Sequence, residues 1–120
     1  MNTMQFEFDA VVAHLYKQGR PAKDELGTCF YRSPEGLSCA VGCRIPDEMY
    51  RKSMEGTCVS ALSGLPQVIT KYEDMFDLLQ YAHDSCPTKA DGTFNKTHLK
   101  QRLRNVANSF NDLTFKEPQL

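Results

Sequence analysis

The apolar residues of this chain change their spacing twice, and that change constrains the fold more than any single motif. The first stretch has apolar residues at i, i+3, i+4 and i+7, the spacing of one helix face: Phe8, Val11, Val12 and Leu15. Residues 29–31 and 39–41 are rich in strand-favouring side chains instead, and the "SPEG" between them is typical of a turn. Helical spacing returns after residue 70. We therefore expect an α+β fold with a small antiparallel β-hairpin at about residues 28–42.

The remaining elements follow from their boundary signals. Asn2 or Thr3 can cap the first helix, and Gly19 is well placed just past its end. Pro46, with two acids behind it, predicts a short helix that ends near residues 54–56. Residues 57–62 fit either a third short strand or one turn of helix.

Two C-terminal amphipathic helices complete the expected core. Thr70 and Glu73 form a capping box, and an apolar face follows it: Met75, Leu78, Leu79 and Ala82. The last helix should begin near Asn95 and bury a second apolar set: Leu99, Leu103, Val106, Ala107 and Phe110. A chain of 120 residues is the length of one domain, so we expect residues 1–120 to form a single domain with residues 113–120 as a tail.

Gly42 lies where the second predicted strand must bend toward Pro46. Glycine is favoured there by either a positive φ or a close approach of another part of the chain. We expect this position to tolerate substitution poorly for one of these two reasons.

The five cysteines argue for a reduced protein. An odd count leaves one thiol over in any complete set of disulfides, and buried free cysteine behaves as a small apolar residue. Cys39 and Cys43 are three residues apart, but a structural zinc site normally needs a second close pair, which the sequence lacks. A redox motif would have two residues between the cysteines. We expect no metal ion and no cofactor.

His83-Asp84 is the one doublet that resembles a motif of metal phosphohydrolases. Such an enzyme needs further His and Asp ligands, and His14 and His98 have no acidic neighbour in a recognisable pattern. The alternative is a histidine that stabilises the C-terminal end of a helix. No phosphate-binding glycine loop or nucleophile motif is present. We therefore predict no catalytic residues.

The overall charge argues against nucleic acid and membranes as partners. The net charge is −1, and the longest apolar runs have four or five residues. The first twelve residues carry acids where a secretory signal carries basic residues, so we expect a cytoplasmic protein.

One regularly spaced basic strip stands out on the last predicted helix, where Lys96, Lys100 and Arg104 follow i, i+4, i+8 spacing. It is either a solvated face, neutralised by acids such as Glu73, Asp74 and Asp77, or a docking strip for an acidic surface or a phosphate. Arg32 and Arg44 near the hairpin could extend it. These five basic residues are the predicted binding site.

Cys39-Ala-Val-Gly, Ile45-Pro-Asp, Tyr50 and Met54-Glu-Gly, together with "LLQYAHD", resemble a family of small uncharacterised proteins of tailed bacteriophages and prophages. The resemblance covers about residues 6–113 and implies a phage origin. It brings no catalytic or binding residues with it. What it implies is an accessory protein in the host cytoplasm that binds a host protein and inhibits or redirects it.

Two alternatives from other classes stay open at this point. One is a protein that sequesters or hydrolyses a signalling nucleotide through Arg32, Arg44 and the basic strip. The other is a nucleic-acid-binding accessory protein, which the net charge disfavours.

Overall fold

The computed structural model describes residues 2–119, and its first element is helix α1, Met4–Gln18. The Thr3 hydroxyl accepts the N–H of Phe6 at 3.1 Å and so caps the helix. Gly19 follows the last turn at a φ of 76°, and its N–H bonds back to the carbonyl of Leu15. The predicted helix and both of its ends are confirmed, with Thr3 rather than Asn2 as the cap.

The C-terminal half contains α2, Gln67–Lys71, α3, Glu73–Ser85, and α4, Lys96–Asn108. The predicted start of the last helix is confirmed, because the Asn95 side chain accepts the N–H of His98 at 3.2 Å. The predicted capping box is wrong. Thr70 lies inside α2, which begins after Pro66, and Tyr72 precedes α3 without a side-chain cap.

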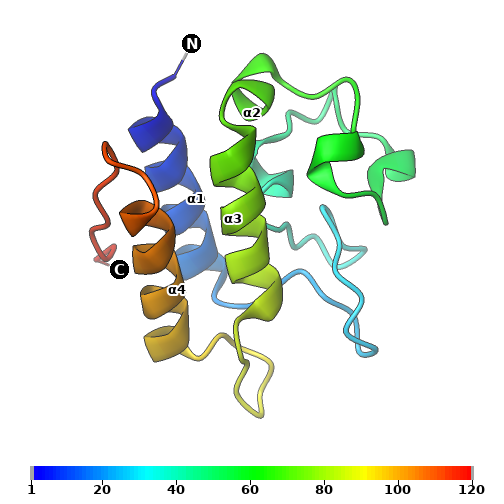
Figure 1. Cartoon of the computed structure of the whole chain (residues 1–120). Helices are drawn as coiled ribbons and strands as arrows, with labels where there is room; N and C mark the ends of the chain where they lie inside the picture. The colour runs from blue at the N-terminus through cyan, green and yellow to red at the C-terminus, as the bar shows by residue number, and fades with distance from the viewer. Residues whose placement is uncertain (1, 120) are drawn as a thin grey trace.

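Helices α1, α3 and α4 lie side by side, with α3 running antiparallel to α4 (Figure 1). Helix α3 contacts both of the others. Residues 20–66, coloured light blue to green, occupy the far side of α3 from α4 (Figure 1). The core between these parts includes several fully buried large side chains: Phe8, Leu15, Phe76, Leu79, Phe94, Leu99 and Leu103. The three helices and the long loop therefore share one apolar core.

The predicted apolar faces are mostly confirmed. In α3, Met75, Leu79 and Ala82 are buried, but Leu78 is 39% exposed and Phe76 is fully buried in its place. All four residues predicted for the buried face within α4 are buried, whereas Phe110 is half-buried and lies beyond the helix end at Asn108.

The predicted α+β fold is wrong, because residues 2–119 form no β-strand. Three isolated antiparallel bridges take the place of a sheet, and Arg32–Ser38 is the one inside the predicted hairpin. The turn at "SPEG" does form, since the N–H of Gly36 bonds to the carbonyl of Ser33. After Cys39, whose N–H still bonds to the carbonyl of Tyr31, the second arm curls into a 3-10 turn, Gly42–Arg44.

Side chains take the hydrogen bonds that a sheet would have supplied. The Glu55 carboxylate accepts the backbone N–H groups of Tyr31 and Arg32 at 2.8 and 3.0 Å. The Gln18 amide bonds both backbone groups of Ser38 at 2.9 Å. Because these buried or half-buried backbone groups are already satisfied, the loop needs no neighbouring strand.

The predicted short helix at Pro46 is also wrong. The N–H groups of Met49 and Tyr50 bond to the Pro46 carbonyl and close one turn, but Arg51 is extended. A 3-10 turn, Lys52–Met54, follows it. For residues 57–62, the structure shows the helical alternative, a 3-10 turn at Val59–Ala61.

Gly42 is explained by close packing and not by a positive φ. A Cβ atom at this position would lie 1.9 Å from the carbonyl oxygen of Tyr31. The backbone of the 3-10 turn therefore rests directly on the backbone of the loop's first arm, and only glycine leaves room for it.

Candidate functional site

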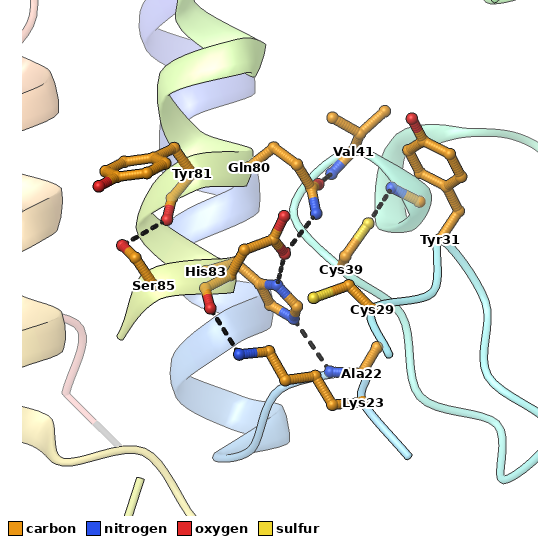
Figure 2. A network of polar contacts seen from close by, with 12 residues as sticks. Ala22, Lys23, Cys29, Tyr31, Cys39, Val41, Gln80, Tyr81, His83 and Ser85 are labelled. Atoms are coloured by element: carbon orange, nitrogen blue, oxygen red, sulfur yellow. Dashed lines mark hydrogen bonds and ion pairs between the residues drawn. The ribbon is translucent and has the colours of Figure 1, made fainter. Parts of the chain in front are cut away.

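The His83-Asp84 doublet lies at the C-terminal end of α3, where it holds the long loop against the helix (Figure 2). His83 is fully buried, and its Nε2 accepts the backbone N–H of Ala22 at 3.0 Å. Its Nδ1 is 2.7 Å from Oδ1 of Asp84. Because Nε2 must accept from an amide, the proton is on Nδ1 and is donated to the carboxylate. Both ring nitrogens are therefore used inside the fold.

Asp84 is the centre of this network. Its carboxylate also accepts from the Gln80 amide at 2.9 Å, and its backbone carbonyl accepts from Lys23. Burial favours a raised pKa for Asp84, but hydrogen bonds from His83, Cys29 and Gln80 outweigh it and hold the pKa below its usual value. Asp84 is therefore ionised at neutral pH.

Gln80 extends the same network to the cysteine-rich segment. Its Oε1 accepts the backbone N–H of Val41 at 3.1 Å (Figure 2). A cavity of about 330 Å³ lies between this side of α3 and the loop, and it is lined by Cys29, Cys58, Asp77 and Asp84 among others. No group of three or more His, Cys, Asp or Glu side chains suited to a metal ion occurs within residues 2–119.

All five cysteines are free thiols. Cys39 is fully buried, and its sulfur accepts the N–H of Gly42 at 3.2 Å. Cys43 points its thiol at the carbonyl of Ala40. Burial raises the pKa of both Cys39 and Cys43 to about 12. At neutral pH both are protonated thiols that pack and hydrogen-bond in the core.

Arg44, one of the predicted binding residues, forms an internal ion pair with Glu7 on α1. The guanidinium is bidentate, with Nε and Nη2 at 2.8 and 2.9 Å from the two carboxylate oxygens. Glu7 is fully buried and also accepts from Asn2. Burial alone would raise the pKa of Glu7, but the hydrogen bonds from Arg44 and Asn2 lower it below its usual value.

Arg32, also predicted to bind a partner, is engaged within the loop. Its Nη1 pairs with Asp47 at 2.7 Å, and its Nη2 donates to the Ile45 carbonyl at 2.6 Å. The guanidinium also lies over the Tyr50 ring, 4.7 Å from its centroid. Arg32 thus has a counter-ion, a carbonyl and an aromatic face as partners.

The basic strip of α4 is on another side of the molecule, where the C-terminal segment crosses it. Lys100 pairs with Glu117 at 3.4 Å, and Glu117 also accepts from the Tyr16 hydroxyl of α1 at 3.1 Å. Arg104 lies over the Phe115 ring at 5.7 Å, while Lys96 is exposed. The structure therefore joins Lys100 and Arg104 to the tail, and it does not join them to Arg32 or Arg44.

A groove between α3 and α4 forms a separate site, which we call the α3/α4 groove. Its volume is about 140 Å³, and it is lined by Leu78, Tyr81, Ala82, Arg102, Asn105, Val106 and Ser109. Tyr81 is 67% exposed. In Figure 2 its ring projects to the left of α3, away from Cys29 and Tyr31. The groove is mainly apolar, and Arg102 is its only charged lining residue.

The sequence reasoning missed this groove, although one signal was present. Tyr81 lies off the apolar face of α3, and a large aromatic residue at a solvent position of an amphipathic helix is unusual. Leu78 was expected in the core and Arg102 lies off the i, i+4, i+8 strip, so neither drew attention to the space between the two helices.

Comparisons with protein-family models, with curated proteins and with solved structures found no match for this chain. Among residues 2–119, the helices are too short and too polar for any of them to cross a membrane. The site must therefore be interpreted from its own geometry.

Proposed function

We propose that the protein is a phage-encoded accessory protein that binds a host protein in the host cytoplasm and inhibits or redirects it. The resemblance of the segment around residues 39–56 to phage and prophage proteins supports the origin. The observation that carries the binding function is the α3/α4 groove, with the exposed side chains of Leu78 and Tyr81 at its edge.

Tyrosine at such a position suits a binding surface. It combines a large apolar area with a polar hydroxyl, and few rotamers must be fixed when a partner covers it. Leu78 lies one turn away on the same helix and widens the apolar area. Two neighbouring apolar side chains beside a groove give a partner a central contact that can be buried completely.

The same geometry gives less support to nucleotide binding. A phosphate group would need Arg32 and Arg44, but each already pairs with a carboxylate of the protein. A phosphate that took the Nε and Nη2 donors of Arg44 would leave the fully buried Glu7 carboxylate without its counter-ion, which is strongly unfavourable.

Site-specific photo-crosslinking in bacterial host cells tests the proposal. A photoreactive phenylalanine analogue replaces Tyr81 in one variant and Leu26 in a control. Leu26 is 91% exposed and lies outside the groove. We expect position 81 to give a discrete crosslinked host protein that position 26 does not give. No crosslink from position 81, or the same products from both positions, would contradict the proposal.

A further inference from the structure

We infer that the α3/α4 groove holds one aromatic or branched aliphatic side chain of the partner protein, beside a partner carboxylate that pairs with Arg102. This inference rests on the proposed binding function and specifies the chemistry of the partner. Two observations support it: the size of the groove, and the Arg102 guanidinium, whose buried Nε has no hydrogen-bond partner among residues 2–119.

The size of the groove sets the first part of the partner's chemistry. At about 140 Å³ it is close to an engineered apolar protein cavity of ~150 Å³ that binds benzene. One phenyl ring or one leucine side chain therefore fills it, whereas a methyl group would leave most of it empty. The lining by Leu78, Ala82 and Val106 matches such a side chain in polarity.

The side chain of Arg102 determines the second part of the partner's chemistry, which is its charged group. Its Nε is buried and has no hydrogen-bond partner within the described part of the chain. Neither of its two Nη atoms is both buried and without a hydrogen-bond partner. Among residues 2–119, no ion pair involves Arg102. The guanidinium is therefore partly removed from water, is not paired with a carboxylate of residues 2–119, and is still open at its Nη groups. A partner carboxylate can bind there with little further loss of hydration.

The same features favour a segment of another protein over a second copy of this chain. A stable dimer interface buries ~1,200 Å² or more, and it needs an extended apolar area. Leu78 and Tyr81 are the large exposed apolar residues beside the groove, and the groove spans only residues 78–82 and 102–109. This area suits one anchoring side chain of a partner.

Blocked dipeptides provide a direct test with purified full-length protein. N-acetyl-Phe-Glu-amide and N-acetyl-Glu-Phe-amide are titrated in NMR experiments, each against the analogue in which glutamine replaces glutamate. We expect backbone shifts at Ala82, Arg102 and Val106, and at least about fivefold tighter binding for the better glutamate peptide than for its glutamine analogue, because a charge-assisted hydrogen bond replaces a neutral one.

Two variants locate the effect. Arg102→Gln should reduce the preference for glutamate to less than about twofold, while binding of the phenylalanine ring persists. Lys96→Gln removes a positive charge from an exposed position of the same helix and should leave the preference unchanged. An equal loss in both variants would show that the net charge of α4 and not Arg102 selects the carboxylate, which contradicts the inference.

Further outcomes separate this inference from the proposed function. If position 81 crosslinks a host protein but the glutamate and glutamine peptides bind equally, the binding function stands and the carboxylate is wrong. If the peptides bind as expected but no host crosslink forms, the groove chemistry stands and the function is wrong. If no dipeptide shifts the groove residues, the inference fails. It also fails if sedimentation shows a dimer that Tyr81→Ala dissociates, since the groove then belongs to a second copy.

Discussion

Replacement of Gly42 by alanine is the sharpest test of how the long loop is packed. The added Cβ would lie 1.9 Å from the carbonyl oxygen of Tyr31 and 2.6 Å from its carbonyl carbon. Ordinary carbon–oxygen contacts are ~3.3 Å or longer, so the two backbones must separate by about 1.4 Å. Both contacting atoms belong to the backbone, and neither can rotate away as a side chain could.

The cost follows from what holds Tyr31 in place. Its N–H bonds to Glu55, its hydroxyl bonds to the carbonyl of Thr57, and its carbonyl accepts the N–H of Cys39. Overpacking costs about 1–3 kcal/mol, and loss of the buried Cys39 hydrogen bond adds about 1–2 kcal/mol. We expect Gly42→Ala to lower the free energy of unfolding by about 2–5 kcal/mol, a large share of the ~5–15 kcal/mol of a typical domain.

Urea unfolding followed by circular dichroism measures this difference. Gly36→Ala is the matched control, because Gly36 has a φ of 87° and nothing within 4 Å of its would-be Cβ. Alanine there introduces only the left-handed backbone strain, about 1–2 kcal/mol. If Gly42→Ala costs no more than Gly36→Ala, the two backbones are not in the contact described and the reasoning is refuted.

Three further predictions use the polar contacts. Arg44→Met should destabilise the protein by about 2–3 kcal/mol at neutral pH, since it leaves the Glu7 carboxylate buried without its counter-ion. The pKa of Glu7 is lowered in the folded state, so the stabilisation by the ion pair is complete at a pH above 4.5, the ordinary pKa of a glutamate. It is lost as the pH falls through the folded-state pKa, and the unfolding curves of the wild type and Arg44→Met should therefore converge in acid. Cys58, the exposed cysteine, should react with a thiol reagent faster than the other four, and equal rates would contradict the burial described. Lys100→Glu should cost less than about 1 kcal/mol in the free energy of unfolding, because the pair with Glu117 is exposed to solvent; a larger loss would contradict the exposure described.

Helices α1, α3 and α4 could be predicted from the sequence because their signals are local, whereas α2 was not predicted. The N-terminal cap at Thr3, the left-handed end at Gly19 and the cap at Asn95 each depend on residues within one turn. The apolar spacing within α4 likewise identified its buried face correctly. The capping box predicted at Thr70 was wrong because this local signal could not show that the chain is already helical from Gln67 onward.

The predicted hairpin failed for a reason that no local pattern contains. Strand-favouring residues and a turn signal were present, but several backbone groups of this segment bond to side chains that come from elsewhere in the sequence. Gln18 lies on α1, Glu55 follows a 3-10 turn, and Gln80 lies on α3. No local sequence pattern links these polar residues to residues 28–42, and only the tertiary arrangement shows that their side chains take the place of a sheet.

The basic strip illustrates the same limit. Its spacing along α4 was correct, but glutamate 117 in the predicted tail, and not an acid of α3, provides the ion pair for Lys100. The α3/α4 groove was missed because Leu78 and Arg102 lie on different helices. Their proximity depends on how α3 packs on α4, which the sequence does not show.

Under the proposed function, helix α3 has a separate task on each of two sides. Gln80 and His83 hold the long loop through bonds to Val41 and Ala22, and their side chains are needed for the fold. Tyr81 lies between them in sequence but is 67% exposed, so its ring contributes little to the stability of the isolated protein. Packing on α1 and α4 and the bonds to the long loop hold α3 in place without the Tyr81 ring. Because the helix is already fixed in the isolated protein, the α3/α4 groove is formed in advance, and under the proposed function little entropy would be lost when a partner side chain enters it.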